Sequence, residues 1–563
     1  MFADHFIMRQ FVLFFIIFLF LSTDIFSQST NHDWQLNGFL SAYGESYFSN
    51  NLTPRRDDFT WRVSGNPTLT YKNFSLPVYF LAGSYENVSR QMFNRIGISP
   101  HYKWITVHLG YRSVEFSPLV VSQVYFLGAG VELNPSIIRL GFIRGRILRP
   151  VPISALPNNQ PSYERNGYAV KFGLGTKENF VDLIFFNGRD DTNSIAGDTV
   201  YNPLVKPQEN VALGISSKLR IKKNIFFQVD GGASLRSRDL HNSIIDDNGE
   251  IPDQFNSIYI LRASSLFNTA IKSRIEYRDT KYNFGFEYHR IDQDYTTLAI
   301  NYMRTDLQRF GLFVKQNFLK NRLKIHVKTD WEHNNLRHNK ISETQRNNNM
   351  LHALYRMNRS LIFNFSFLNS NMNTSVNEVY STYVVSSKQR NHIVSLNTNY
   401  IFPRQTKYTQ VANVGFSITD SKIRAQELNP AVQKSNSFNL SSNYSLTIAD
   451  LELMIHGGFD FGSSAYHSGA SVFNTNYRHP HAGVQKMFLE KKLTASLLTS
   501  VYFNRAGGAL INTVWRGNLA AAYKIFQSTS LQLRLSQMLN HPASAMLPNS
   551  AEFIISAELR VGL

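Results

Sequence analysis

The sequence ends in Ala551-Glu-Phe-Ile-Ile-Ser-Ala-Glu-Leu-Arg-Val-Gly-Leu563, where apolar and polar side chains alternate almost without a break. Alternation with a period of two places successive side chains on opposite faces of a β-strand, so the stretch predicts a strand with one apolar face. The pattern reaches the last residue, although free chain ends usually fray into polar tails. A strand ordered to that point indicates a neighbour on each side, as in the closing strand of a barrel.

Ladders of the same kind recur through the chain. One runs from Tyr282 to Tyr288 and another from Leu323 to Trp331, with polar residues at most intervening positions. Each ladder is about ten residues long, which is the length that a tilted strand needs to cross the hydrocarbon core of a bilayer. No helical period of comparable strength interrupts the ladders. Further ladders begin at Tyr168, Leu451 and Leu531.

The connections between the ladders differ in length in a regular way from Tyr163 onward. Very short links alternate with long polar ones, which is typical of bacterial outer-membrane barrels, whose turns face the periplasm. The short links are Thr176–Asn179, Lys222–Lys223, Asp279–Thr280, Lys320–Asn321, Ala449–Asp450 and Gln527–Ser528, and the long ones are Asn187–Gln208, Ser237–Ser257, His333–Asn347, Asn371–Arg390 and Asp420–Ser435.

These patterns predict an all-β fold, a transmembrane antiparallel up-and-down β-barrel closed by the C-terminal strand. Roughly nineteen strands are expected after Tyr163, and about six candidates precede it. Because such barrels have an even number of strands, we expect one miscounted strand between Ser89 and Pro161 and about 24 strands in total, either 24 or 26. The six candidates are Trp34–Phe48, Phe59–Lys72, Phe74–Asn87, Tyr102–Arg112, Gln123–Leu133 and Ile137–Leu148.

Residues 1–27 have the pattern of a cleaved signal peptide. Arg9 precedes the apolar run Phe11–Leu21, which is too short to span a bilayer comfortably. We expect cleavage after Ser27, which leaves residues 28–563 as the barrel; an uncleaved membrane anchor is the alternative. The sequence has no cysteine, so a lipid-modified cysteine and disulfide bonds are excluded.

Composition agrees with a barrel in the outer membrane of a Gram-negative bacterium. The mean hydropathy of −0.24 is too low for a helical membrane protein, yet 13% of the residues are aromatic, as expected where aromatic side chains form belts at both interfaces. The net charge of +18 favours anionic partners. Expected partners are outer-membrane lipids and lipopolysaccharide, the barrel-assembly machinery, anionic solutes and a protein of a secretion or surface-glycan system. Because the chain is exported, we expect no nucleic-acid partner.

The region 89–161 differs from the rest because glycine, proline and aromatic residues are concentrated there. It contains Ser99-Pro-His-Tyr-Lys-Trp-Ile-Thr-Val-His-Leu-Gly-Tyr-Arg112, then Phe116-Ser-Pro-Leu119 and Phe126-Leu-Gly-Ala-Gly-Val-Glu-Leu-Asn-Pro135. This run resembles one found in a family of large outer-membrane β-barrels of Bacteroidota, which implies the same fold and location. Its glycines also allow close backbone approach, so the region could fold inward as a constriction. The alternative is two ordinary strands joined by a proline-rich loop.

The candidate residues for such a constriction are basic or imidazole side chains. Arg144 and Arg146 share one strand face and could form a positive ladder in the lumen, although Leu140 and Phe142 share that face too. An interface-anchoring role is the alternative for both arginines. The complete set of candidates is His101, Lys103, His108, Arg112, Arg144 and Arg146.

No motif predicts an enzyme, a cofactor or a metal site. The sequence has no Gly-x-Ser-x-Gly nucleophile elbow. Neither the pair His333 and His338 nor the pair His479 and His481 has a third ligand at a zinc-binding spacing. The segment Asp246–Glu250 resembles part of a calcium loop, but an Asn-Gly turn explains it as well.

The sequence therefore favours a passive or gated channel with a polar, net-positive lumen. One alternative is a non-conducting structural or accessory barrel of a secretion or surface-glycan system, which binds partners through its long loops. A second alternative is an outer-membrane enzyme with a site assembled across several strands. A barrel of this size needs inward-folded segments, because porins of about 16–18 strands already enclose an aqueous channel.

Overall fold

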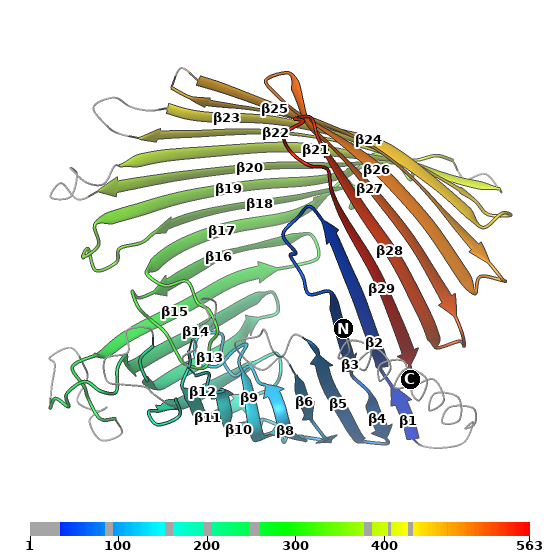
Figure 1. Cartoon of the computed structure of the whole chain (residues 1–563). Coiled ribbons are helices and arrows are strands. Elements are labelled where there is room, and N and C mark those ends of the chain that lie inside the picture. Colours follow the sequence, from blue (N-terminus) through cyan, green and yellow to red (C-terminus); the bar gives the residue numbers. More distant parts are fainter. Residues whose placement is uncertain are drawn as a thin grey trace.

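The computed structural model describes residues 34–84, 94–152, 161–195, 205–246, 251, 259–376, 386–403, 407–425, 432–469 and 471–563. Their strands form one continuous sheet in which every named strand pairing is antiparallel and which closes on itself as a barrel (Figure 1). The described part of the chain has no helix of sufficient length and hydrophobicity to cross a membrane. The predicted signal peptide, residues 1–27, lies outside the described residues.

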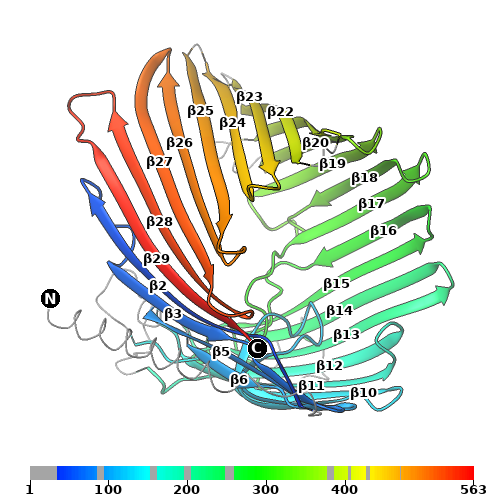
Figure 2. The same cartoon turned by 90° about the vertical axis from the view of Figure 1, so that its right-hand side faces the viewer.

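The strands follow one another round the ring in chain order (Figure 2). They are β1 Trp34–Asn37, β2 Phe39–Asn50, β3 Phe59–Gly65, β4 Thr68–Tyr71, β5 Phe74–Gly83, β6 Arg95–Ile98, β7 His101–Tyr102, β8 Ile105–Ser113, β9 Tyr125–Leu133, β10 Ile138–Leu148, β11 Glu164–Gly175, β12 Phe180–Asp191, β13 Glu209–Lys222, β14 Ile225–Ser237, β15 Ser265–Arg278, β16 Tyr282–Ile291, β17 Leu307–Phe318, β18 Leu323–His333, β19 Ser342–Arg356, β20 Leu361–Val376, β21 Ser387–Ile401, β22 Tyr408–Ala425, β23 Val432–Ile448, β24 Leu453–Ser468, β25 Ser471–Phe488, β26 Leu493–Ala506, β27 Ala509–Lys524, β28 Thr529–Pro542 and β29 Ser550–Gly562.

The barrel is closed by its last strand, as predicted. β29 pairs with β28 on one side and with β2 on the other, in a register that runs from Phe39 opposite Gly562 to Asn50 opposite Ala551. The N–H of Leu563 still donates a hydrogen bond of 3.0 Å to the carbonyl oxygen of Gly38. Closure removes the unpaired edge that β29 would otherwise expose.

The 29 strand segments of the described residues occupy 26 positions in the ring, because three strands are interrupted. β1 and β2 flank Gly38, which has a φ of +117° that favours glycine. β3 and β4 flank Pro67, and β6 and β7 flank Pro100, and neither proline can donate to a ladder. The expected total of 24 or 26 is met at its upper value.

The strand that sequence analysis missed is the interrupted pair β6 and β7, residues 95–102. It pairs with β5 on one side and with β8 on the other. It lies in the region where we expected the miscount. Its two short segments, separated by Ser99-Pro100, are too brief to show an alternating pattern.

Two connections that lie inside the ring, residues 114–124 and 292–306, show which side chains of the strands point inward. Phe116 of the first lies against Gly141 of β10, and Tyr295 of the second lies against Gly232 of β14. These glycines therefore belong to the inward face. Alternation and strand register assign the other positions from there.

The outward face has an apolar band on one side and a polar zone beyond it. Along β20, Phe363, Phe365 and Phe367 precede Asn369 and Asn371 at successive outward positions. The apolar part faces the end where the connections are short, and the polar part faces the other end. We call these the short-turn end and the long-loop end. The band has the polarity of a surface in contact with lipid.

Several predicted long loops are shorter in the structure than the sequence indicated. The segment 371–390 is strand as far as Val376 and again from Ser387, and most of 420–435 belongs to β22 and β23. The predicted loop 333–347 is also partly strand, because β19 begins at Ser342. These strand parts lie beyond the apolar band, where both faces are polar, so hydrophobic alternation gave no signal.

Candidate functional site: the barrel interior

The two inward connections bind each other. The Tyr295 hydroxyl donates to the carbonyl oxygen of Leu119 at 2.6 Å, and the Thr297 hydroxyl donates to that of Val120 at 2.8 Å. Leu119 and Val120 are completely buried. Tyr295 is itself completely buried, and its burial raises the pKa of its hydroxyl, so the phenol remains a neutral donor at physiological pH.

Against the wall, these connections form an apolar core inside the ring. Phe116 and Val120 of segment 114–124 pack with Ile143 of β10 and with Ile184 and Phe186 of β12, which face inward. Burying a side chain of this size stabilises the fold by about 1.5–3 kcal/mol. The connections are therefore parts of the fold and not loosely attached loops.

Polar contacts anchor segment 292–306 in its middle and at its C-terminal end. The N–H of Leu298 donates to the side-chain oxygen of the buried Asn210 at 3.0 Å. At the C-terminal end, the Asp306 carboxylate accepts from the N–H groups of Asn335 and Leu336 and pairs with Lys340. Burial alone would raise the pKa of Asp306, but the Lys340 ammonium and these N–H groups outweigh it and lower that pKa. Since the pKa is lowered in the folded state, this anchor holds at neutral pH and weakens only when acid protonates Asp306.

Of the predicted constriction, residues 89–161, only part folds inward. Segment 114–124 does so, most of 94–113 and 125–148 forms strands of the wall, and 89–93 and 153–160 lie outside the described residues. The structure thus combines both alternatives, with ordinary strands joined by an inward-folded segment.

The six predicted constriction residues do not form one site. His101, His108 and Arg112 belong to the inward face of their strands. Lys103 lies in the two-residue turn between β7 and β8 at the short-turn end. Arg144 and Arg146 face outward with Phe142, because the alternate residue Gly141 faces inward. The hypothesis that these two arginines form a ladder in the lumen is therefore corrected. Leu140 and Phe142, which share their face, had already indicated an outward orientation in the sequence.

His108 belongs to a chain of polar contacts that links four strands of the ring, the interrupted strand β6/β7, β8, β9 and β11. Its Nδ1 lies 2.9 Å from Ser99 Oγ, its Nε2 lies 3.2 Å from Glu132 Oε1, and the other Glu132 oxygen accepts from Lys171 Nζ at 2.9 Å. A serine, a histidine and a carboxylate in sequence are the groups of a hydrolytic triad. Ser99 and His108 are only 4% and 8% exposed, however, so a substrate cannot reach the hydroxyl in this arrangement.

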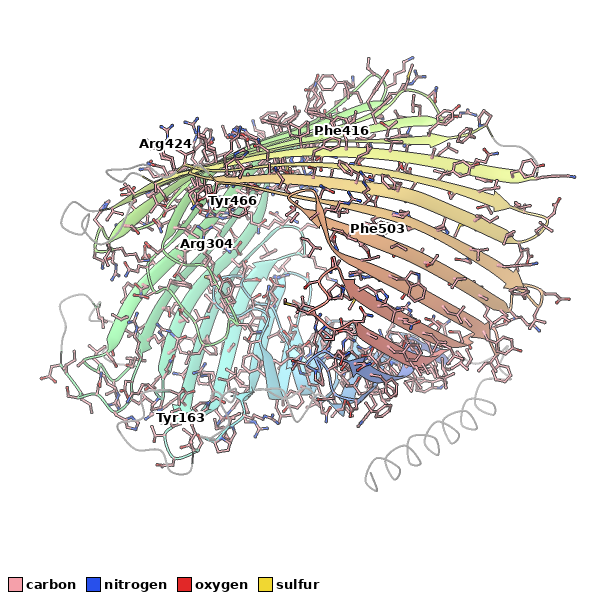
Figure 3. All side chains as sticks on the ribbon, turned by 45° about the horizontal axis from the view of Figure 1, so that its top comes forward. Tyr163, Arg304, Phe416, Arg424, Tyr466 and Phe503 are labelled. Carbon is pink, nitrogen blue, oxygen red and sulfur yellow. The ribbon has the colours of Figure 1, made fainter. Side chains whose placement is uncertain are left out.

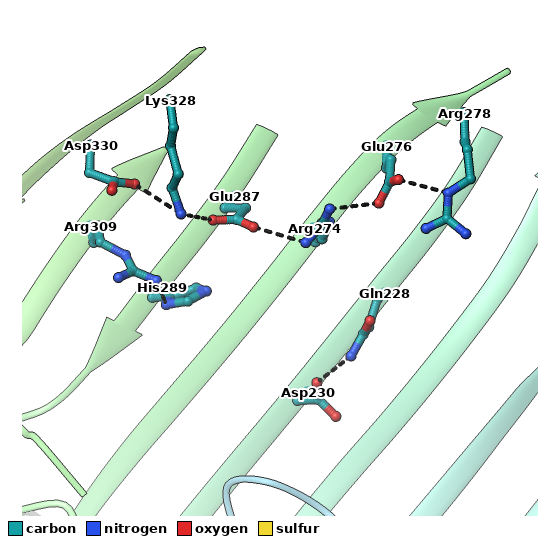
Figure 4. Close-up of polar contacts among 10 residues, drawn as sticks. All are labelled: Gln228, Asp230, Arg274, Glu276, Arg278, Glu287, His289, Arg309, Lys328 and Asp330. Carbon is teal, nitrogen blue, oxygen red and sulfur yellow. Dashed lines mark hydrogen bonds and ion pairs between the residues drawn. The ribbon is translucent and has the colours of Figure 1, made fainter. Parts of the chain in front are cut away.

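Charged residues cover the inward face of β14–β18 (Figure 4). Arg274 lies between Glu276, at 2.8 Å, and Glu287, at 3.1 Å, and Lys328 lies 3.0 Å from Glu287. Basic side chains outnumber acidic ones on this face. The basic set is Arg236, Lys272, Arg274, Arg278, Arg309, Lys315, Lys324 and Lys328, and the acidic set is Asp230, Glu276, Glu287, Asp330 and Glu332.

A cavity of about 390 Å³ lies where this charged face meets the inward connections. Lys272, His289 and Arg309 line it from the wall. Arg304 lines it from segment 292–306 (Figure 3), where it pairs with Glu332. The cavity offers several cationic donors to an anion that enters the lumen.

The inward face of β20–β23 is polar but nearly uncharged. Serine and asparagine predominate, and they contact one another across the strands, as Ser366 does with Ser395 at 3.2 Å. Their hydroxyl and amide groups can donate and accept hydrogen bonds without attracting either sign of charge. The set includes Asn364, Ser366, Ser370, Asn391, Ser395, Asn397, Asn413, Ser417, Ser437, Asn439, Ser441 and Asn443.

Two buried ion pairs connect strands of the wall near the inward connections. Sequence analysis did not predict them. Arg139 donates to both oxygens of Asp182, at 2.7 and 2.9 Å, and Arg165 contacts Asp190 with the same two distances. Arg139 and Asp182 lie on either side of Gly173 of β11, which has no side chain to separate them. Cross-strand proximity of this kind depends on register and has no local sequence signal.

The substitution Asp182→Ala is expected to destabilise the barrel by about 3–5 kcal/mol, because it leaves the Arg139 guanidinium, only 15% exposed, without its carboxylate. Urea unfolding of the refolded barrel measures the loss. The control is Glu178→Ala, which removes the exposed partner of Arg220 and should cost about 0–1 kcal/mol. Equal losses in the two variants would contradict the importance of the buried pair.

Comparisons with known proteins give no family assignment. No protein-family model matches the chain. No curated protein matches it either.

Solved structures that the fold is similar to include three outer-membrane proteins. The outer membrane protein OpdK from Pseudomonas aeruginosa shares 12% identity over 63% of this chain and 94% of its own, with a TM-score of 0.28. OpdQ from Pseudomonas aeruginosa shares 11% over 65% and 98%, with a TM-score of 0.34. The P pilus usher PapC translocation pore shares 11% over 94% and 99%, with a TM-score of 0.26. No conclusion about this chain rests on likenesses this weak.

Proposed function

We propose that this protein is a channel in the outer membrane of a Gram-negative bacterium, exported by the signal peptide 1–27, and that hydrophilic solutes cross its lumen. The observation that supports this most is the distribution of polarity. The outward face has an apolar band, whereas the inward face is charged along β14–β18 and rich in serine and asparagine along β20–β23. Polar groups facing the interior of a lipid-embedded ring favour a water-filled path.

Anionic solutes are the substrate class that we propose, because basic side chains outnumber acidic ones on the charged face. Lys272 and Arg309 also line the cavity beside the inward connections. A cationic lining raises the local concentration of anions and lowers that of cations. We propose that segments 114–124 and 292–306 reduce the cross-section of a ring that would otherwise be wider than a porin.

Lipopolysaccharide is the proposed partner on the outside of the ring. Beyond the apolar band, a cavity of about 820 Å³ at the long-loop end is lined by Trp331, Asn369, Lys388 and Arg390, among others. These four residues share the outward face with Phe367. Basic and amide side chains just beyond a lipid-facing band suit the phosphates and sugars of a glycolipid.

The first test is conductance in planar bilayers. The purified protein should give discrete current steps, and a salt gradient should give a reversal potential of the sign for anion selectivity. The double variant Lys272→Gln/Arg309→Gln should shift that potential toward zero. The matched control, Arg144→Gln/Arg146→Gln, removes two outward-facing cations and should leave the potential unchanged.

A second candidate function is a non-conducting accessory barrel that acts through partners. The apolar core that the inward connections form against the wall favours it, because such a core fills part of the lumen permanently. A barrel that inserts into bilayers without current steps, and that co-purifies from mild detergent with a stoichiometric partner, would favour this function over the channel. An enzymatic function would rest on Ser99, whose burial opposes it.

A further inference from the structure

The inward face of the hairpin β24–β25 brings two histidines and an aspartate together. Asp460 of β24 lies opposite His479 of β25, and His481 follows two residues later on the same face. The candidate ligand atoms of the three side chains all lie within 4.8 Å of one another. Asp460 supplies the third ligand that the sequence did not show beside His479 and His481, because it lies 19 residues upstream of His479.

The individual contacts show which atoms converge. His479 Nδ1 donates to Asp460 Oδ2 at 2.8 Å, and His481 Nδ1 lies 3.8 Å from the same oxygen. Ligand atoms around a tetrahedral zinc ion lie about 3.3 Å apart, given bonds of about 2.0–2.1 Å. The two observed distances lie on either side of that value, so small side-chain rotations would suffice to bind an ion.

Asn443 of β23 fixes the orientation of one imidazole. Its side-chain oxygen accepts from His481 Nε2 at 2.7 Å, so Nε2 holds the proton and Nδ1 presents a lone pair toward Asp460. That Nδ1 atom is buried and has no hydrogen-bond partner. Metal-binding histidines usually donate their second nitrogen to such a neighbour, which sets the tautomer.

The surroundings leave the site compact but accessible from the lumen. The His479 ring stacks on Tyr502 of β26 with 3.7 Å between ring centroids. Gly458 lies opposite His481, and a side chain there would collide with His481 Nε2. The three candidate ligand side chains are 13–25% exposed, which suits groups that an ion reaches through water.

We propose that Asp460, His479 and His481 bind one divalent transition-metal ion, of the zinc class, on the lumen wall. Two imidazole nitrogens and one carboxylate oxygen suit zinc, nickel or copper better than magnesium or calcium, which prefer oxygen ligands. Binding takes the Nδ1 proton from His479, and water from the lumen completes the coordination. The proposal does not rest on channel activity, since a silent barrel could bind the ion equally well.

Zinc titration of the purified protein in detergent, without a polyhistidine tag, tests the proposal. Calorimetry should show one zinc ion bound per chain, and EDTA should remove it. Asp460→Asn, His479→Ala and His481→Ala should each weaken binding at least about tenfold, and Asn443→Ala should weaken it by about 10–100-fold through loss of ring orientation. Substituted cobalt should give the visible absorption of a tetrahedral nitrogen and oxygen site.

The chain offers a matched control in His326 and His352, an inward cross-strand histidine pair on β18 and β19. His326→Ala/His352→Ala should leave zinc affinity unchanged. Circular dichroism of every variant should show a folded barrel, and Asp460→Asn keeps the side-chain shape. The proposal is overturned if zinc does not bind saturably, if the double variant His479→Ala/His481→Ala binds as the wild type does, or if the control pair loses binding equally.

Discussion

A chain that lacks residues 550–563 is expected to form no closed barrel. β29 joins β28 to β2 and pairs along its length with both. Its removal leaves two strand edges whose backbone N–H and C=O groups would face lipid, where each unsatisfied group costs several kcal/mol. Direct pairing of β28 with β2 would make an odd ring of 25 strands with one parallel pair, and bacterial outer-membrane barrels have an even number of strands. We expect complete loss of folded protein, measured as protease resistance after refolding into detergent or vesicles.

A single substitution provides a milder form of this experiment. Ile555→Pro removes one N–H from the middle of β29 and should lower the folding yield strongly. Ala545→Pro introduces the same residue in the connection 543–549, outside the sheet, and should fold normally. Folding of the truncated chain, or equal yields of the two proline variants, would contradict closure through β29.

Replacement of residues 115–123 by a short glycine and serine linker is expected to raise single-channel conductance by about twofold or more. The segment occupies space inside the ring, and conductance rises with the cross-section that water can fill. The variant should also unfold more easily, because Ile143 and Phe186 would lose the apolar groups of Phe116 and Val120 that cover them. Planar-bilayer recording measures the first effect and urea unfolding measures the second.

The control for this variant is a change of the same type outside the ring. Replacement of residues 544–548 in the connection between β28 and β29 by glycine and serine should leave conductance unchanged, since Met546 there is 95% exposed. If conductance is unchanged in a folded variant without residues 115–123, the inward segment does not limit the solute path. If the variant without residues 115–123 does not fold, Tyr295→Phe provides a second test. This substitution removes only the hydrogen bond to Leu119 and should raise conductance by a smaller amount.

Most of the ring could be predicted from local patterns. The strand count after Tyr163, the closing strand and the parity argument that located the miscount all rest on alternation and on the requirement for an even number. Strand ends were predicted less well where the two faces of a strand do not differ in polarity. Asn369 and Asn371 lie in the part of β20 beyond the apolar band, where both faces are polar, so their alternation could not be seen.

The candidate sites were predicted less well than the fold. His108 was chosen for its type and its unusual surroundings, and it belongs to a buried network with Glu132 and Ser99. Arg144 and Arg146 were also chosen for their type, and they face outward. Lys272 and Arg274 on the inward face of β15 also lie at alternate positions of one strand. The same pattern could have identified them as lumen residues, but they were not among the candidates.

The sequence alone determined that the chain is a closed antiparallel ring with one apolar and one polar face, because side-chain alternation is a local property that a strand shows within about ten residues wherever its two faces differ in polarity. Only the tertiary structure decided which residues meet inside the ring. Asp460 and His479 lie 19 residues apart on consecutive strands, and Arg139 reaches Asp182 across a whole strand. Such contacts depend on the register of neighbouring strands and on the path of the inward connections. Both are set by the summed pairing and packing of many residues, so no single stretch of sequence contains them.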